Sequence, residues 1–154
     1  MTSTASALHI HEGDTGLDLL RQWQNRGASL GGFFSLIGAR VEAYADGEVV
    51  IRCEIDEGHA NFIGLVHGGL TAALIDMAGG AMMSRLAPGE IVLTTDLAVR
   101  YLNGAPQDCS ALEARGVVTY QDTRKAVVDV MVTTDAGLDV ARGVVGLAIR
   151  PNPV

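Results

Sequence analysis

The chain has 154 residues, which suits one domain with a substantial core, and its 48% hydrophobic and 19% charged residues exclude general disorder. Eleven Lys and Arg residues against 18 Asp and Glu residues give a net charge of −7, so the chain has no broad basic surface for DNA or RNA. We therefore expect no nucleic-acid partner. Any phosphate-bearing ligand must be held by a few local cations or by helix N-termini.

Cys53 and Cys109 are too few for a disulfide framework and lack the spacing of a redox or metal motif, so both are expected to be reduced thiols. The first 14 residues contain neither a basic region nor an apolar core of a signal peptide. No stretch reaches the roughly 18 apolar residues of a membrane span. These features predict a soluble, cytoplasmic protein without a membrane partner.

The N-terminal 30 residues are expected to form an extension of the main domain, which we assign to residues 31–154. Residues 1–15 are aperiodic, and a metal site at His9 and His11 is the less favoured interpretation of that segment. From Leu17 to Arg26 apolar residues recur at helical spacing before Gly27, which predicts a short amphipathic helix. Residues 31–34 read as a flexible aromatic connection, either ordinary packing or the lid of a ligand pocket.

A hairpin is predicted next, because residues 41–44 and 48–55 flank Asp46-Gly47, where both turn positions tolerate positive φ. The second strand alternates, with four apolar residues on one face: Val49, Ile51, Cys53 and Ile55. Four further strands are expected at residues 91–102, 110–121, 125–134 and 140–150.

Between the two groups of strands, residues 70–86 are apolar around nearly the whole helical circumference, which predicts one buried helix. The order is a terminal helix, two strands, one long helix and four strands. This order favours an α+β fold in which an antiparallel sheet wraps around the single apolar helix.

The carboxylate of Asp76 interrupts this apolar helix and must be hydrogen-bonded or face a wet cleft. Its neighbours three and four residues away are small, which leaves a shallow depression for a ligand: Ala72, Ala73, Gly79 and Gly80. Each glycine inside a helix costs about 1 kcal/mol, so the pair implies close approach of a substrate or of another helix. The alternative is a tight helix contact in which an internal donor pairs with Asp76.

His67-Gly68-Gly69 directly precedes the helix, where free N–H groups and the positive end of the helix dipole can bind an oxyanion. A carbonyl at Gly68 would lie roughly 12 Å from Asp76 of the same helix. The gap closes if two helices meet antiparallel across a two-fold axis. We therefore predict an obligate homodimer, which pairs again into a homotetramer.

The segment His59–Gly69, followed by Asp76 and by Thr94-Thr95-Asp96-Leu97, resembles the hot-dog-fold acyl-CoA thioesterases. The specific branch contains the phenylacetate-pathway and 4-hydroxybenzoyl-CoA thioesterases, and the resemblance extends from about Phe33 to Ile149. It implies a helix wrapped by the sheet, a dimer that joins two sheets, and sites at the dimer interface.

The resemblance also implies five catalytic positions. Asp76 would be the nucleophile or general base, and the Gly68 N–H would polarise the thioester carbonyl. Asn61 and His67 would orient water, the thioester or the loop, and Thr94 would assist Asp76.

Simpler interpretations remain for some of these residues. The alternative for His67 is a helix cap alone, and the alternative for Asn61 is a residue that only stabilises the loop. Thr94 alternates with Val92, Asp96, Ala98 and Arg100 on one expected strand face, where a threonine needs no function. Some relatives have Glu at the position of Asp76 and Thr at that of Gly80, which leaves direct attack and water activation both open.

Substrate-binding residues are assigned more broadly. Gly69 joins Gly68 at the helix start, and Phe33 and Met83 are candidates for an acyl pocket, although such residues also form ordinary cores. Arg124 and Lys125 are adjacent cations that are expected to hold coenzyme A phosphates, with solvated turn charges as the alternative.

The function favoured by these features is hydrolysis of an acyl-CoA to free CoA and a carboxylic acid. No metal or organic cofactor is expected, since CoA is part of the substrate and the sequence lacks a recognisable metal-ligand spacing. Two alternatives are a non-catalytic acyl-CoA-binding hot-dog protein and a hot-dog dehydratase or hydratase. The latter needs a different His/Asp or His/Glu arrangement.

Overall fold

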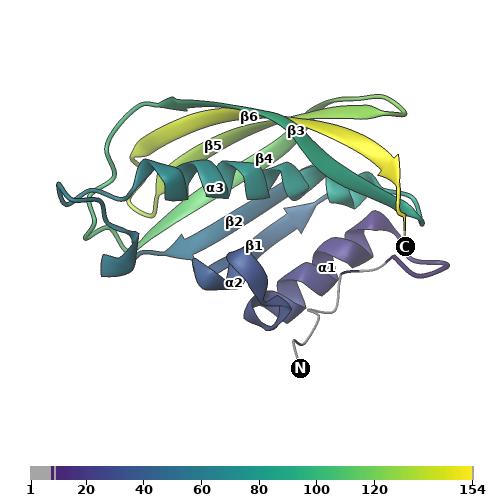
Figure 1. Cartoon of the computed structure of the whole chain (residues 1–154), viewed down its shortest axis with the longest axis horizontal. Coiled ribbons are helices and arrows are strands. Elements are labelled where there is room, and N and C mark those ends of the chain that lie inside the picture. The colour runs from purple at the N-terminus through teal and green to yellow at the C-terminus, as the bar shows by residue number, and fades with distance from the viewer. Residues whose placement is uncertain (1–7, 9, 154) are drawn as a thin grey trace.

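Six antiparallel strands form one sheet in the computed structural model, which describes residues 8 and 10–153, so His9 lies outside the described residues. The order across the sheet is β1-β2-β4-β5-β6-β3. The strands are β1 (Ala39–Ala45), β2 (Glu48–Glu54), β3 (Glu90–Tyr101), β4 (Ala111–Gln121), β5 (Lys125–Thr134) and β6 (Asp139–Pro151). The sheet curves around helix α3 (Gly68–Ala78), which confirms the predicted α+β architecture (Figure 1).

The curvature of the sheet comes with irregular strand pairing. Register shifts interrupt every ladder except that of β2 with β4. Such bulges bend strands and increase their twist, so the sheet can wrap around a helix. The predicted hairpin is present, since β1 pairs antiparallel with β2, and in its turn Gly47 has a positive φ of 69° whereas Asp46 does not.

The bulge in β3 changes which residues share a face. Thr94 pairs with Leu147 and Asp96 pairs with Gly146, so Thr95 is the extra residue. The expected common face of Thr94 and Asp96 is therefore wrong. Val92 and Thr94 lie on the helix-facing side, whereas Asp96, Ala98 and Arg100 lie on the outer side.

Helix α3 is shorter than the predicted helix over residues 70–86. It ends at Ala78, and residues Gly79–Arg85 form a 3-10 helix, η3. A Cβ added at Gly80 would lie 2.5 Å from the Trp23 ring, and one at Gly79 would lie 2.9 Å from the Val145 side chain. The glycine pair therefore allows α1 and β6 to pack closely against η3. Close approach of another helix was one of the two explanations expected for these glycines.

The predicted N-terminal helix is present as α1 (Gly16–Arg26), and the backbone N–H of Thr15 donates to Asp18 Oδ2 at 2.7 Å. It packs against η3 and β1. The expected flexible connection at residues 31–34 is instead largely helical, within α2 (Gly32–Leu36). Two further 3-10 turns are η1 (Gly27–Leu30) and η2 (Glu57–His59). The assignment of residues 1–30 as a separate extension remains a prediction.

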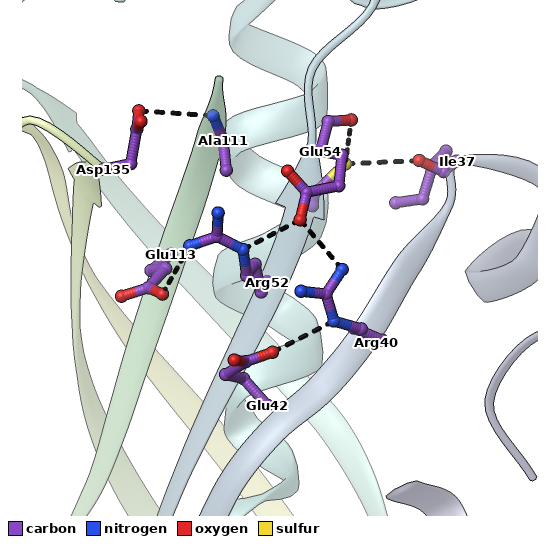
Figure 2. A network of polar contacts seen from close by, with 9 residues as sticks. Ile37, Arg40, Glu42, Arg52, Glu54, Ala111, Glu113 and Asp135 are labelled. Atoms are coloured by element: carbon purple, nitrogen blue, oxygen red, sulfur yellow. Dashed lines mark hydrogen bonds and ion pairs between the residues drawn. The ribbon is translucent and has the colours of Figure 1, made fainter. Parts of the chain in front are cut away.

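The outer face of β1, β2 and β4 is polar. Arg40 pairs with Glu42 and Glu54, and Arg52 pairs with Glu54 and Glu113 (Figure 2). The inner face packs its apolar residues, including Val49, Ile51 and Cys53, into the core, as predicted for one face of β2. No helix among the described residues is long and apolar enough to cross a membrane.

The helix lies directly on the sheet at Gly116 of β4. A Cβ there would lie 2.2 Å from the carbonyl oxygen of Ala78. Gly116→Ala is expected to lower the free energy of unfolding by about 1–3 kcal/mol, because backbone atoms must move to make room. Urea unfolding should measure this loss.

The matched control is Gly58→Ala, because the added Cβ would lie 3.0 Å from Oδ1 of the exposed Asp56 side chain, which caps the turn at the Gly58 N–H and can shift slightly without any movement of the backbone. Its effect should stay within about 0.5 kcal/mol. Equal stability of the two variants would contradict the close contact at Gly116.

Candidate functional site

Asp76 and Thr94 meet at the exposed end of the helix–sheet contact. The Thr94 hydroxyl donates a hydrogen bond to Asp76 Oδ1 at 2.8 Å. This contact follows from the bulge at Thr95, which turns Thr94 toward the helix. The pair presents a carboxylate, oriented by a hydroxyl, whose second oxygen remains open to a ligand or to water.

Asp76 is exposed in the single chain and hydrogen-bonded to Thr94, as expected for a carboxylate in this helix, but the expectation that the helix is buried on all sides is wrong. The sheet covers only one side of α3, where Leu70, Leu74, Ile75 and Ala78 are buried. The other side is open and has small or partly buried residues: Gly69, Ala72, Ala73 and Met77. An apolar helix with one uncovered side leaves a surface that a second subunit can bury.

The start of α3 carries the second part of the site. His67 is the N-cap, and its Nδ1 accepts the N–H of Gly69 at 2.9 Å. Gly68 is the first helical residue, and its carbonyl oxygen accepts the Tyr101 hydroxyl at 2.6 Å. The ring of Tyr101 lies so close that a Cβ at Gly68 would be 3.2 Å from it. Tyr101 therefore holds the backbone at the proposed oxyanion donor.

Asn61 organises the loop that leads into the helix. Its Oδ1 accepts the N–H groups of Ile63 and Leu65, both at 3.0 Å. Asn61 thus stabilises the loop, as one of the two interpretations of this residue expected. His67 likewise caps the helix, as expected. Both residues position the segment before Gly68. Their proposed contacts with water or thioester remain predictions.

One chain does not bring Gly68 to Asp76. Both lie on the same continuous helix, eight residues and therefore about 12 Å apart. Tyr101 contacts the first end, and Thr94 contacts the second. The separation expected from the sequence is thus present. Gly68 with Tyr101, and Asp76 with Thr94, are called below the two half-sites of the proposed site.

Met83 lines a cavity of about 290 Å³ whose walls are partly apolar and partly polar, the polar side chains being those of Glu90 and Asn152. The cavity lies between η3, α1 and the start of β3, and its other apolar side chains are Leu8, Ile10, Leu19, Leu86, Ile91 and Val92. Val92 lies two residues before Thr94 on the same side of β3. Phe33, in contrast, is 57% exposed on α2 beside β1, at the sheet edge opposite β3.

Arg124 lies in the β4–β5 turn and Lys125 begins β5, and their backbone N–H groups donate to Asp122 Oδ1 at 2.7 and 2.8 Å. These hydrogen bonds, with one from Tyr120, hold the pKa of the Asp122 carboxyl below its usual value. Both cations line an open cleft of about 810 Å³ that also contains Arg150 and Glu90. The structure therefore adds a third cation to the predicted pair.

Sequence reasoning missed Tyr101 and Arg150. Tyr101 joins the helix-facing side of β3 only because the bulge shifts the alternation, and Arg150 joins the turn through the pairing of β5 with β6. Both residues lie at or near the end of an expected strand, and this position was the feature of the sequence that could have pointed to them.

Cys53 is a core residue and not a nucleophile. Its side chain is fully buried, and burial raises the pKa of the thiol to about 11. This confirms the interpretation as a small core residue, because a thiol with such a pKa stays protonated near neutral pH.

The antiparallel six-stranded sheet that wraps around α3 is the hot-dog thioesterase fold. The family model of the thioesterase superfamily matches residues 63–141, just over half of the 154 residues. The chain belongs to the thioesterase superfamily.

Individual relatives agree with this assignment. A protein of Halobacterium salinarum is 40% identical over 86 residues, which are 52% of this chain and 57% of the relative. Human acyl-coenzyme A thioesterase 13 is 36% identical over 64 residues, 40% of this chain and 44% of the relative. The chain thus spans about half the length of these curated relatives. A thioesterase family protein from Silicibacter pomeroyi shares the fold, with a TM-score of 0.77, 20% identity, and coverage of 86% of this chain and 99% of that chain.

Proposed function

We propose that the protein hydrolyses an acyl-CoA thioester to free CoA and a carboxylic acid. The observation that carries this proposal is the Asp76 carboxylate, held by Thr94 on the open side of α3. A carboxylate of this kind can activate water or attack the carbonyl. Superfamily membership and the name of the human relative support a thioester of coenzyme A as the substrate class.

The proposed site needs two subunits. Asp76 and Thr94 of one subunit would act on a carbonyl polarised by the Gly68 N–H of the other, with Gly69 beside it. Asn61 and His67 would hold the donor segment in place. The uncovered side of α3 and the exposed side chains of Phe62 and Ile63 supply apolar surface for such a dimer. Further pairing into a tetramer belongs to the same proposal.

The proposed reaction uses carboxylate, backbone N–H and water, with no additional cofactor. Gly80 has no room for the threonine of some relatives, because Trp23 lies against it. In this chain the hydroxyl beside the acid is that of Thr94. We infer that the chain belongs to the branch with the phenylacetate-pathway and 4-hydroxybenzoyl-CoA thioesterases. Asp76 would either attack the carbonyl directly or activate water. A cytoplasmic location fits the two free cysteines.

The cavity beside Met83 is the proposed acyl pocket. Most of its lining side chains are apolar, and the lining reaches Val92, two residues before Thr94 on β3, so an acyl group placed there would extend its thioester toward Thr94 and Asp76. Phe33 would contribute only if the assembled protein brings α2 to the site.

A thiol-release assay over aromatic, short-chain and medium-chain acyl-CoAs tests the proposed function. Turnover of at least one class is expected, with preference for acyl groups that fit the cavity. The rival is a non-catalytic acyl-CoA-binding protein, which would bind a thioether analogue but release no thiol from any substrate. That result would overturn the proposed hydrolysis.

Coenzyme A phosphates are expected to contact the cation cluster of Arg124, Lys125 and Arg150. Replacing Arg124 and Lys125 by Gln should raise KM for acyl-CoA several-fold at low salt and less at high salt, because exposed charges are screened. Steady-state kinetics at two salt concentrations measure this effect. Arg21→Gln, an exposed cation on α1, is the control. An unchanged KM at both salt concentrations would contradict the phosphate contact.

A further inference from the structure

Tyr101 and His67 hold opposite ends of one amide group at the start of α3. The Tyr101 hydroxyl donates to the carbonyl oxygen of Gly68 at 2.6 Å, and the N–H of Gly69 donates to His67 Nδ1 at 2.9 Å. This carbonyl and this N–H belong to the same amide, which joins Gly68 to Gly69. The plane of the amide is therefore fixed from both ends, in a segment whose two glycines have no side chains to restrict the backbone.

The hydrogen bond to Nδ1 also determines which ring nitrogen of His67 carries the proton. A neutral imidazole has one N–H donor and one acceptor nitrogen, so a ring that accepts at Nδ1 has its proton on Nε2. Within the part of the chain that the structure describes, no group is hydrogen-bonded to Nε2 of this exposed side chain. The ring therefore presents an N–H donor, and no acceptor, at the end opposite the cap.

We propose that Tyr101 is a positioning residue that acts on His67 through the amide between Gly68 and Gly69. A hydrogen bond to an amide oxygen polarises the amide and makes its N–H a stronger donor. The Tyr101 hydroxyl thereby strengthens the bond from Gly69 to Nδ1, and with it the form of His67 that carries its proton on Nε2. The proposal rests on the shared site proposed above, in which this segment lies against the thioester carbonyl.

The contact depends on the sheet as well as on the glycine. The bulge at Thr95 places Tyr101 on the helix-facing side of β3, where it pairs with Ala141 of β6. A Cβ at Gly68 would lie 3.2 Å from the Tyr101 hydroxyl oxygen, so the bare backbone of a glycine lets the phenol approach the helix start. Tyr101 is the one described residue whose side chain donates to this carbonyl oxygen, so no other side chain replaces the hydroxyl when it is removed.

Nitrogen-15 NMR of the histidine rings tests the proposed link directly. Tyr101→Phe removes the hydroxyl and keeps the ring, and spectra at about pH 8, where an imidazole is ordinarily neutral, show which nitrogen carries the proton. In the wild type His67 should be almost entirely in the Nε2–H form. In Tyr101→Phe the fraction of the Nδ1–H form should rise several-fold toward that of a free imidazole, and the Gly69 amide hydrogen should exchange several-fold faster.

The control is Tyr44→Phe, which removes the hydroxyl of a half-buried tyrosine on β1. It should change neither the ring form of His67 nor the exchange rate of the Gly69 amide. A role of Tyr101 in packing alone would also leave both quantities unchanged in Tyr101→Phe, because the aromatic ring is retained. Unchanged values in Tyr101→Phe would therefore overturn the positioning role.

Kinetics test whether this positioning serves the reaction. Tyr101→Phe is expected to lower kcat by about fivefold to tenfold while KM for acyl-CoA stays within about twofold, because a misplaced donor weakens the transition state more than it weakens substrate binding. In a His67→Ala background the same change should lower kcat by less than about twofold, because no ring remains to be positioned. Equal losses in both backgrounds would show that Tyr101 does not act through His67.

The two proposals can fail separately. A Tyr101→Phe variant with an altered ring form of His67, in a protein that releases no thiol from any acyl-CoA even as wild type, would keep the positioning and overturn the hydrolysis. An active wild-type enzyme whose Tyr101→Phe variant keeps the wild-type ring form and the wild-type kcat would keep the hydrolysis and overturn the positioning.

Discussion

Asp76→Asn is expected to lower turnover by about 10²- to 10⁴-fold, the usual loss when a general base is removed, or by more if Asp76 is the nucleophile. The amide keeps the shape of the carboxylate and can still accept the Thr94 hydroxyl at Oδ1, which is 2.8 Å away in the wild type. It lacks the basicity needed to activate water and the negative charge needed for attack. Thiol release under saturating substrate measures the loss.

Folding and binding should survive this substitution, because Asp76 is exposed and forms no ion pair among the described residues. The thermal midpoint and the binding of a non-hydrolysable thioether analogue should therefore stay close to the wild-type values. Asp139→Asn removes an exposed carboxylate at the start of β6 and serves as the control. A folded Asp76→Asn protein with near wild-type turnover would refute the catalytic assignment.

Gly68→Pro should lower turnover by about 10²- to 10³-fold, because it removes the N–H that is proposed to polarise the carbonyl. Gly68 is the first residue of α3, a position where proline is well tolerated, and His67 before it already has the extended conformation that proline requires. Gly68→Ala is the matched control. It adds a similar Cβ, 3.2 Å from the Tyr101 ring, but keeps the N–H.

The comparison of the two variants isolates the hydrogen bond. If Gly68→Ala loses as much turnover as Gly68→Pro, crowding against Tyr101 explains the loss and the oxyanion assignment is wrong. Circular dichroism and the thermal midpoint should show that both variants fold.

Mixing the two inactive chains tests whether each site is shared. Co-expressed Asp76→Asn and Gly68→Pro chains form half of their dimers as mixed pairs, and each mixed pair has one unaltered site. Activity should recover to about a quarter of the wild-type value. Sites contained within one chain would give no more activity than the separate variants.

Much of this fold follows from local sequence patterns. Alternation in residues 48–55 and in the four later runs predicted the strands, and the apolar run from Leu70 predicted the enclosed helix, because side-chain periodicity is set by the backbone geometry of each element. The position of Gly68 and Asp76 on one helix also followed from sequence, and with it the separation of the two half-sites.

The tertiary structure alone decided what those elements present to one another. Alternation could not reveal the extra residue at Thr95, so the sequence placed Thr94 and Asp96 on one face, whereas the pairing with β6 separates them. Likewise, the glycines at 79 and 80 needed Val145 and Trp23 to explain them. Periodicity reports the local backbone of a segment, but bulges, close approaches and the exposed side of α3 depend on partners far away in the sequence, which no local pattern encodes.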